Sequence, residues 1–166
     1  MRIKSGAWLH FLFYNIRVDR RARYQVIPRT LIFVFQQNHI LLMRKEKWRN
    51  RYNALGGHLE RGEDVITGAA RELIEEAGIS GLTLEVVGNI LIDDSDSTGI
   101  CVFLIRCDAA DQHIVQGDEG ELAWIALNDL SQVPVVPDLP DLVARVVQHQ
   151  PDSPFISLHY TRDQSI

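Results

Sequence analysis

Hydrophobic positions along the chain form short runs that predict β-strands. Residues 30–35 and 39–44 are β-branched and apolar, and the turn-like residues 36–38 separate them, so these two runs predict a β-hairpin. Residues 45–51 are mostly polar and basic, which predicts a loop. Four further apolar runs predict strands over residues 82–92, 100–107, 122–127 and 155–160.

Two segments instead have helical periodicity. Between residues 64 and 77 the apolar side chains recur at intervals of three and four, and Gly78 is placed to end the helix. Residues 138–148 repeat the pattern, with Leu139, Leu142 and Val146 on one side. Because strands and helices are mixed without regular βαβ alternation, the predicted fold class is α/β in its α+β form, a mixed β-sheet sandwiched between helices.

Composition and charge narrow the class of protein. The 166 residues are 46% hydrophobic and 23% charged, which is typical of one compact domain. The longest strongly apolar stretch, residues 7–16, is far shorter than the roughly 20 residues of a membrane-spanning helix. The net charge is −5, and residues 31–166 carry 21 acidic and 10 basic side chains, which disfavours nucleic-acid binding. We therefore expect neither a membrane nor a nucleic acid as a partner.

No repeat or low-complexity linker divides the chain, so residues 1–24 are interpreted as an N-terminal extension and residues 25–166 as one domain. The extension could be an added strand, a dimer contact or a mis-chosen start. Its first residues faintly resemble a signal peptide, but no small-residue cleavage site follows. Cys101 and Cys107 are separated by about 20 Å along one predicted strand, which is too far for a disulfide. Together these features predict a cytoplasmic protein.

The helix predicted over residues 64–77 carries three carboxylates on one face. Glu72, Glu75 and Glu76 fall within an arc of roughly 100° in helical projection, away from the apolar stripe. One interpretation is a solvated acidic surface. The other is a site for a hard divalent cation such as Mg²⁺, which prefers carboxylate and carbonyl oxygens. Zinc is not expected, because no Cys/His cluster has ligand spacing.

The residues around these glutamates favour the second interpretation. The spaced residues are Gly57, Glu63, Arg71-Glu72-Leu73, Glu75-Glu76 and Gly78-Ile79. This pattern matches every specified position of the Nudix box over 23 residues, so the chain resembles the Nudix hydrolase superfamily. The resemblance implies the Nudix fold and the hydrolysis of a nucleoside diphosphate linked to another group X.

The pattern also indicates how the loop and the helix are joined. Gly56-Gly57 permits a loop whose backbone passes close to the metal, with a carbonyl of Gly56 as a candidate ligand. Glu63 can reach Arg71 and tie this loop to the helix. Gly57, Glu63, Arg71 and Gly78 are therefore expected to have structural roles. His58, beside the loop, is interpreted as a packing or substrate-side residue rather than a metal ligand.

The resemblance implies the catalytic roles. Glu72, Glu75 and Glu76 are expected to hold Mg²⁺, with Mn²⁺ as an alternative, and Glu72 is the preferred general base. In the family a further acid from a loop before a late strand commonly completes the metal site or orients the water. Glu119 is the best match to that acid and the second choice as base, with Glu121 in reserve. An ordinary acidic loop is the alternative interpretation of both residues.

Substrate recognition is predicted from two shorter matches. Residues 52–57 resemble the aromatic-Asn-Gly-aromatic-Gly-Gly sequence of the MutT-like branch, which hydrolyses oxidised purine nucleoside triphosphates, and residues 136–138 resemble a Trp-Pro-Asp sequence that reads the base in some members. Asn53 and Asp138 are therefore candidate base-binding residues, although Val136 replaces the stacking Trp. A helix N-cap is the alternative role for Asp138. Arg44, at the end of a predicted strand, is a candidate ligand for terminal phosphates or simply a solvated surface charge.

The expected function is Mg²⁺-dependent cleavage of a nucleoside triphosphate, such as 8-oxo-dGTP, to nucleoside monophosphate and pyrophosphate. ADP-ribose and dinucleoside polyphosphates are alternative substrates. Their hydrolases carry a proline or a tyrosine beyond the box, and neither residue type occurs between Gly78 and Val133 here. A non-catalytic nucleotide-binding regulator and a structural protein are further alternatives. The expected partner is a small nucleotide, and a homodimer is one use for the N-terminal extension.

Overall fold

The computed structural model describes residues 24–94, 98–110 and 114–161. Its strands are β1 (Gln25–Gln36), β2 (His39–Lys45), β3 (Arg51–Asn53), β4 (Glu85–Asp93), β5 (Thr98–Asp108), β6 (Glu121–Ala126) and β7 (Ile156–Tyr160). Its helices are α2 (Val65–Ala77) and α3 (Leu139–Gln148), with two short 3₁₀ segments, η1 (Glu46–Trp48) and η2 (Leu127–Gln132).

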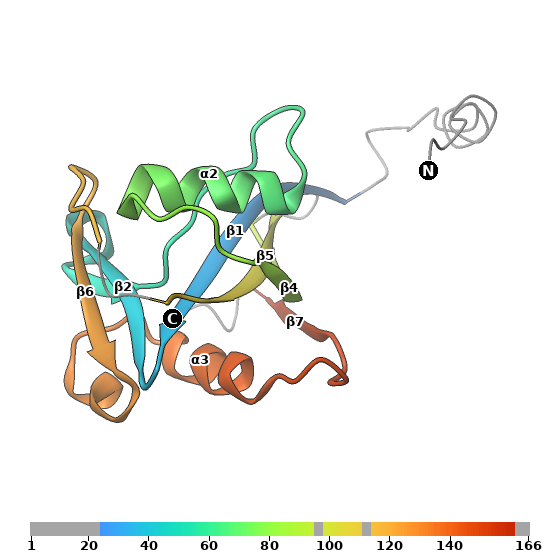
Figure 1. The fold of residues 1–166 in the computed structure, drawn as a ribbon. Coiled ribbons are helices and arrows are strands. Elements are labelled where there is room, and N and C mark those ends of the chain that lie inside the picture. Colours follow the sequence, from blue (N-terminus) through green and yellow to red (C-terminus); the bar gives the residue numbers. More distant parts are fainter. Residues whose placement is uncertain (1–23, 95–97, 111–113, 162–166) are drawn as a thin grey trace, which may run out of the picture.

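All seven strands belong to one mixed sheet (Figure 1). Their order is β3-β2-β1-β5-β4-β7, with β6 paired to β2. β1 and β5 run parallel from the pair Gln25 and Thr98 to the pair Phe35 and Asp108, and β4 and β7 are also parallel. The other neighbouring strands are antiparallel. The long β1–β5 pairing places β1 inside the sheet, where both of its faces can be covered.

The two helices cover opposite faces of the sheet (Figure 1). Ile32 and Val34 of β1 pack in the same cluster as Leu73 of α2, which we call the α2-side core. Phe33 packs in a second cluster with Leu142 of α3, the α3-side core. These five side chains are at most 2% exposed, and each contributes about 1.5–3 kcal/mol to folding by its burial. The predicted mixed sheet between helices is confirmed.

Specific residues begin and end α2. Asp64 is the N-cap residue, because its Oδ1 accepts a hydrogen bond from the Thr67 N–H at 2.8 Å. At the other end, Gly78 has a φ of 67°, and its N–H donates to the Ile74 carbonyl at 3.0 Å. The helix predicted over residues 64–77 is therefore observed with a difference of one residue.

Some predicted bounds differ from the structure. The strand predicted from residue 82 begins at Glu85, because Leu82 packs against the α2-side core without pairing in the sheet. The loop predicted over residues 45–51 contains η1, and its last residue begins β3. Leu127 begins η2 instead of ending a strand. Short polar strands and 3₁₀ segments leave no hydrophobic period, and β3 is a strand because it pairs with β2.

Two further sequence predictions concern the N-terminal extension and the cysteines. Residues 1–23 lie outside the described residues, so the division of the chain near residue 24 stays a prediction. Cys101 and Cys107 both lie in β5 as buried free thiols, as expected. None of the helices in the three described stretches is long and apolar enough to cross a bilayer.

Candidate functional site

Two glycines let the loop between β3 and α2 pass close to both β1 and α2. Gly56 has a φ of 126°, and a Cβ atom there would lie 2.4 Å from the carbonyl oxygen of Thr30. A Cβ atom at Gly57 would lie 2.4 Å from Oε1 of Glu72 and would displace this carboxylate. Because the Gly57 carbonyl also accepts a hydrogen bond from the Thr30 N–H at 2.8 Å, the loop is held between β1 and Glu72.

Arg71 joins this loop to α2. Its Nε and Nη2 donate to the two carboxylate oxygens of Glu63 at 2.8 and 3.1 Å, and Nη2 also donates to the His58 carbonyl at 3.0 Å. Glu63 in turn accepts a hydrogen bond from the Glu60 N–H at 2.8 Å. The hydrogen bond from Arg71 holds the pKa of Glu63 below its usual value. The structure therefore brings Glu63 and Arg71 together as the motif suggests.

The same guanidinium contacts two of the three helix glutamates. Nη1 of Arg71 donates to Glu72 at 3.0 Å and to Glu75, one turn further along, at 2.9 Å. Glu72 is largely buried, whereas the side chain of Glu75 is 52% exposed. Burial raises the pKa of Glu72, and the hydrogen bond from Arg71 only partly opposes that effect. The environment of Glu72 therefore favours proton uptake.

Glu76 is the most buried glutamate and has a different partner. Its side chain is 2% exposed, and Oε2 accepts a hydrogen bond from the Gly56 N–H at 2.7 Å. Oε1 lies 2.9 Å from Nζ of Lys45, and the same Nζ lies 2.8 Å from Glu119. Lys45 therefore connects the helix to the loop before β6. We call Glu72, Glu75, Glu76 and Glu119 the carboxylate cluster.

Lys45 is a site residue that the sequence motifs do not include. Burial lowers the pKa of Lys45, but hydrogen bonds to Glu119 and Glu76 outweigh this effect and hold the pKa above its usual value. Lys45 and Met43 share one face of β2, because side chains alternate along a strand, and Met43 packs in the α2-side core. The alternation of side chains along β2 is therefore the sequence feature that could have placed Lys45 on the same side of the sheet as α2.

Arg44, the neighbouring residue, lies elsewhere. It forms an ion pair with Glu121, and its guanidinium lies 5.6 Å from the ring centroid of Tyr52. Tyr52 belongs to the α3-side core, so Arg44 and Lys45 have opposite surroundings. Of the two acids proposed for the late loop, the structure brings Glu119 to α2 through Lys45 and pairs Glu121 with Arg44.

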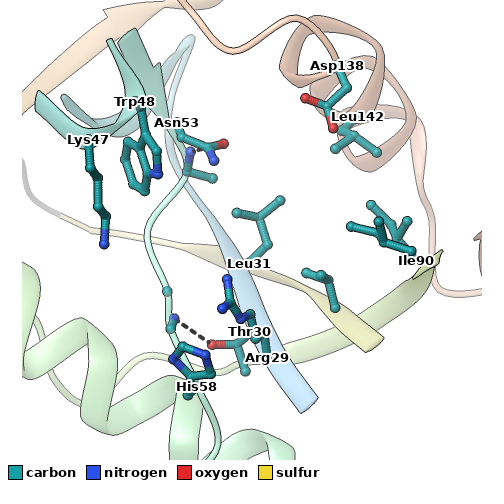
Figure 2. A pocket seen from close by; sticks show the side chains of 15 residues that line it. Arg29, Thr30, Leu31, Lys47, Trp48, Asn53, His58, Ile90, Asp138 and Leu142 are labelled. Carbon is teal, nitrogen blue, oxygen red and sulfur yellow. Dashed lines mark hydrogen bonds between the residues drawn. The ribbon is translucent and has the colours of Figure 1, made fainter. Parts of the chain in front are cut away.

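The Gly56-Gly57 loop, which passes close to Glu72, also lines a cavity of about 530 Å³. Figure 2 shows the side chains around this cavity. Asn53 and Asp138 both line it, although 85 positions of sequence separate them. Its apolar wall includes Leu31, Ile90 and Leu142, which belong to the core beneath α3. We call this space the α3-side cavity. Its volume is within the usual range for small-molecule sites, roughly 300–1,000 Å³.

Two polar side chains of the α3-side cavity, Asn53 and Asp138, make few hydrogen bonds with the described residues. Asn53 Oδ1 accepts a hydrogen bond from the Ala54 N–H at 2.9 Å. Asp138 directly precedes α3, but its side chain makes no capping hydrogen bond, so the predicted N-cap interaction is not observed. His58 also lines the cavity, as its substrate-side interpretation suggested. Burial, then the charges of Arg29 and Lys47, lowers the pKa of His58.

The carboxylate cluster is chemically suited to a hard divalent cation. Its side chains offer only oxygen donors, the ligands that Mg²⁺ prefers. In the part of the chain that the structure describes, no group of three or more His, Cys, Asp or Glu side chains converges on one point. The contacts explain this arrangement: Glu72 and Glu75 turn toward Arg71, while Glu76 and Glu119 turn toward Lys45.

The fold and the site define an α+β domain in which a glutamate-bearing helix and its glycine loop adjoin a cavity of small-molecule size. The NUDIX domain family model matches residues 26–146, and the chain belongs to this family. Nudix hydrolases generally use divalent metal ions.

Comparisons with known proteins agree with this assignment. The chain is 31% identical over 112 residues to a Mus musculus protein named oxidized purine nucleoside triphosphate hydrolase. The aligned region covers 66% of this chain and 72% of the mouse protein. The fold is similar to that of a MutT protein from Bacillus halodurans, with a TM-score of 0.68, 23% identity and coverage of 84% of this chain and 94% of that one. It is also similar to the NUDIX domain of Shewanella oneidensis NrtR, solved with ADP ribose, with a TM-score of 0.65, 14% identity and coverage of 86% and 97%. The prediction of a Nudix hydrolase enzyme is confirmed.

Proposed function

We propose that this Nudix hydrolase cleaves a purine nucleoside triphosphate to the nucleoside monophosphate and pyrophosphate. The observation that carries the proposal is the position of the Gly56-Gly57 loop, which adjoins Glu72 on one side and the α3-side cavity on the other. A nucleotide whose base lies near Asn53 and Asp138 therefore has its phosphates directed toward the carboxylate cluster. The substrate named for the mouse relative supports the same class.

Glu72, Glu75, Glu76 and Glu119, with the Gly56 carbonyl, are the proposed ligands of Mg²⁺, and Mn²⁺ offers the same oxygen preference. Such a metal ion, when bound, lowers the pKa of the attacking water and neutralises the polyphosphate. For the cluster to hold it, Glu72 and Glu75 must turn from Arg71, and Glu76 and Glu119 from Lys45.

Glu72 is the proposed general base. Its pKa is raised by burial, which makes its carboxylate a better proton acceptor than an ordinary glutamate near neutral pH. Glu119 is the second candidate, but contact with Lys45 lowers its pKa and weakens it as a base. Arg44 stays a candidate for terminal phosphates, and this role requires its pair with Glu121 to open.

We assign recognition of the purine to one hydrogen-bond donor and one hydrogen-bond acceptor. The Asn53 amide offers N–H donors, and the Asp138 carboxylate accepts hydrogen bonds, so together they can match a donor and an acceptor on a purine edge. Both come from the ends of elements, β3 and the start of α3, which the sheet and its α3-side core fix in place. An oxidised purine such as 8-oxo-dGTP is the particular substrate that we propose. A cytoplasmic location and a homodimer stay predictions.

The test is hydrolysis of a nucleotide panel with Mg²⁺, with each product identified. The panel contains dGTP, 8-oxo-dGTP, dATP, CTP, ADP-ribose and a dinucleoside tetraphosphate. We expect the oxidised purine triphosphate to react fastest and to yield monophosphate plus pyrophosphate. Preferential cleavage of ADP-ribose or the dinucleotide would refute the base-binding argument but not the Nudix chemistry.

Two variants should be assayed with the same panel, one as a test of the general base and one as its control. Glu72→Gln should reduce kcat by about 10²–10⁴-fold, the usual contribution of a general base. Glu85→Gln removes an exposed carboxylate at the start of β4 and should leave kcat unchanged. Nucleotide binding without turnover in the wild type, over the whole panel, would instead favour the regulator alternative.

A further inference from the structure

Arg29 is a charged residue of the α3-side cavity that no sequence motif includes. Side-chain alternation along β1 puts Arg29 on the same face as Leu31 and Phe33, the face that α3 covers. Figure 2 shows Arg29 beside Thr30 and His58, at the end of the cavity away from Asp138. Its guanidinium is thus directed to the end of the cavity that adjoins the Gly56-Gly57 loop.

The Arg29 guanidinium has a donor without a hydrogen-bond partner among the described residues. This donor is Nε, which is buried. Within the same described part of the chain, Arg29 forms no ion pair with a carboxylate, whereas Arg44, Arg71 and Arg106 all do. A guanidinium carries five N–H donors and stays charged at neutral pH. Its hydrogen-bonding capacity therefore remains available to a ligand.

The charges around Arg29 favour an anion. Lys47 and His58 line the same cavity as Arg29. Among the described lining residues, Asp138 is the one acid, and it lies at the opposite end (Figure 2). The α3-side cavity thus has a cationic end next to the loop and an acidic end next to α3.

We propose that Arg29 binds the phosphate that stays on the nucleoside after cleavage, the α-phosphate, and so selects nucleotides over nucleosides. This inference rests on the proposed function, because it takes the base end of the cavity to be Asn53 and Asp138. The α-phosphate links the nucleoside to the anhydride that is cleaved, so it must lie between that end and Glu72. Arg29 lies in this interval, and its planar fork can bind two phosphate oxygens at once.

The test is metal-free isothermal titration calorimetry, which keeps binding separate from turnover. The probes are dGMP, 8-oxo-dGMP, dAMP and CMP, with deoxyguanosine as a phosphate-free probe. Arg29→Gln removes the charge, Arg29→Lys retains it without the fork, and Arg145→Gln is a matched control at an exposed arginine of α3 outside the cavity lining. We expect Arg29→Gln to weaken monophosphate binding by about 10- to 100-fold, in line with loss of a charge-assisted pair. Arg29→Lys should be intermediate, and deoxyguanosine affinity should not change.

Each other outcome is decisive. An unchanged monophosphate affinity in Arg29→Gln overturns the proposal, as does a wild type that binds no monophosphate. An equal loss for monophosphate and deoxyguanosine assigns Arg29 to packing only. The ranking of bases in the wild type tests the proposed function separately, since a pyrimidine preference refutes the purine substrate while leaving the Arg29 effect intact. Thermal melts establish folding, and Arg29→Lys carries the test if Arg29→Gln unfolds.

Discussion

The carboxylate cluster and the α3-side cavity meet at the same glycine loop but satisfy their polar groups differently. In the cluster each glutamate contacts a basic side chain, and the most buried one, Glu76, also accepts a backbone hydrogen bond. In the cavity Asp138 makes no capping bond and Nε of Arg29 is unpartnered among the described residues. Internal ion pairs therefore stabilise the carboxylate cluster, whereas the described residues of the α3-side cavity keep hydrogen-bonding capacity that a ligand can use.

The largest stability effect that this comparison predicts is at Lys45. Lys45→Met leaves Glu76 buried without its cation, and breaking a buried pair in this way costs about 3–5 kcal/mol. The free energy of unfolding should fall by that amount in urea denaturation. Glu119→Gln is the matched control, because Glu119 is 60% exposed and its pair is worth less than about 1 kcal/mol. Equal, small losses in both variants would contradict the view that the cluster depends on Lys45.

A change at Asp138 should have the opposite signature, with an effect on binding and none on stability. Asp138→Asn should raise KM for the preferred purine triphosphate by about tenfold, the equivalent of 1.4 kcal/mol, because it exchanges an acceptor for a donor at the base. The melting temperature should stay constant, since the side chain makes no capping hydrogen bond. Asp141→Asn, in the first turn of α3 and outside the cavity lining, is the control. A lower melting temperature with unchanged KM would assign Asp138 to helix capping instead.

The smallest expected effect is a pH dependence at Glu63. A hydrogen bond from Arg71 lowers the pKa of Glu63 in the folded protein. A carboxyl group with a lowered folded pKa stabilises the protein above its ordinary pKa, and this stabilisation is lost as the pH falls through the folded pKa. The difference in melting temperature between wild type and Glu63→Gln should therefore be largest at neutral pH and shrink as the pH falls below about 4.5. A constant difference from pH 7 to pH 3, with Glu85→Gln as control, would show that the pair adds no pH-dependent stability.

The helix α2 and its loop could be predicted because their determinants are local. Asp64, Gly78 and the apolar positions between them define the helix within one residue, and the spacing of Glu63 and Arg71 anticipates their contact. Lys45 and Arg44 show the limit of such reasoning. Adjacent strand residues face opposite sides, and which side meets α2 depends on how β2 pairs with its neighbours.

Local features of the chain were enough to predict the Nudix motif, the helix that carries it and the mixed sheet between helices, because spacing and hydrophobic period act over one element at a time. In contrast, the contacts of Lys45 with Glu76 and Glu119, and the cavity shared by Arg29, Asn53 and Asp138, depend on how distant elements pack together. These groups come from β1, β2, β3, α2, the residue before α3 and the loop before β6, and the parallel pairing of β1 with β5 aligns segments about 70 residues apart. Such pairing is a long-range choice of strand order and register, which no local pattern of residues specifies.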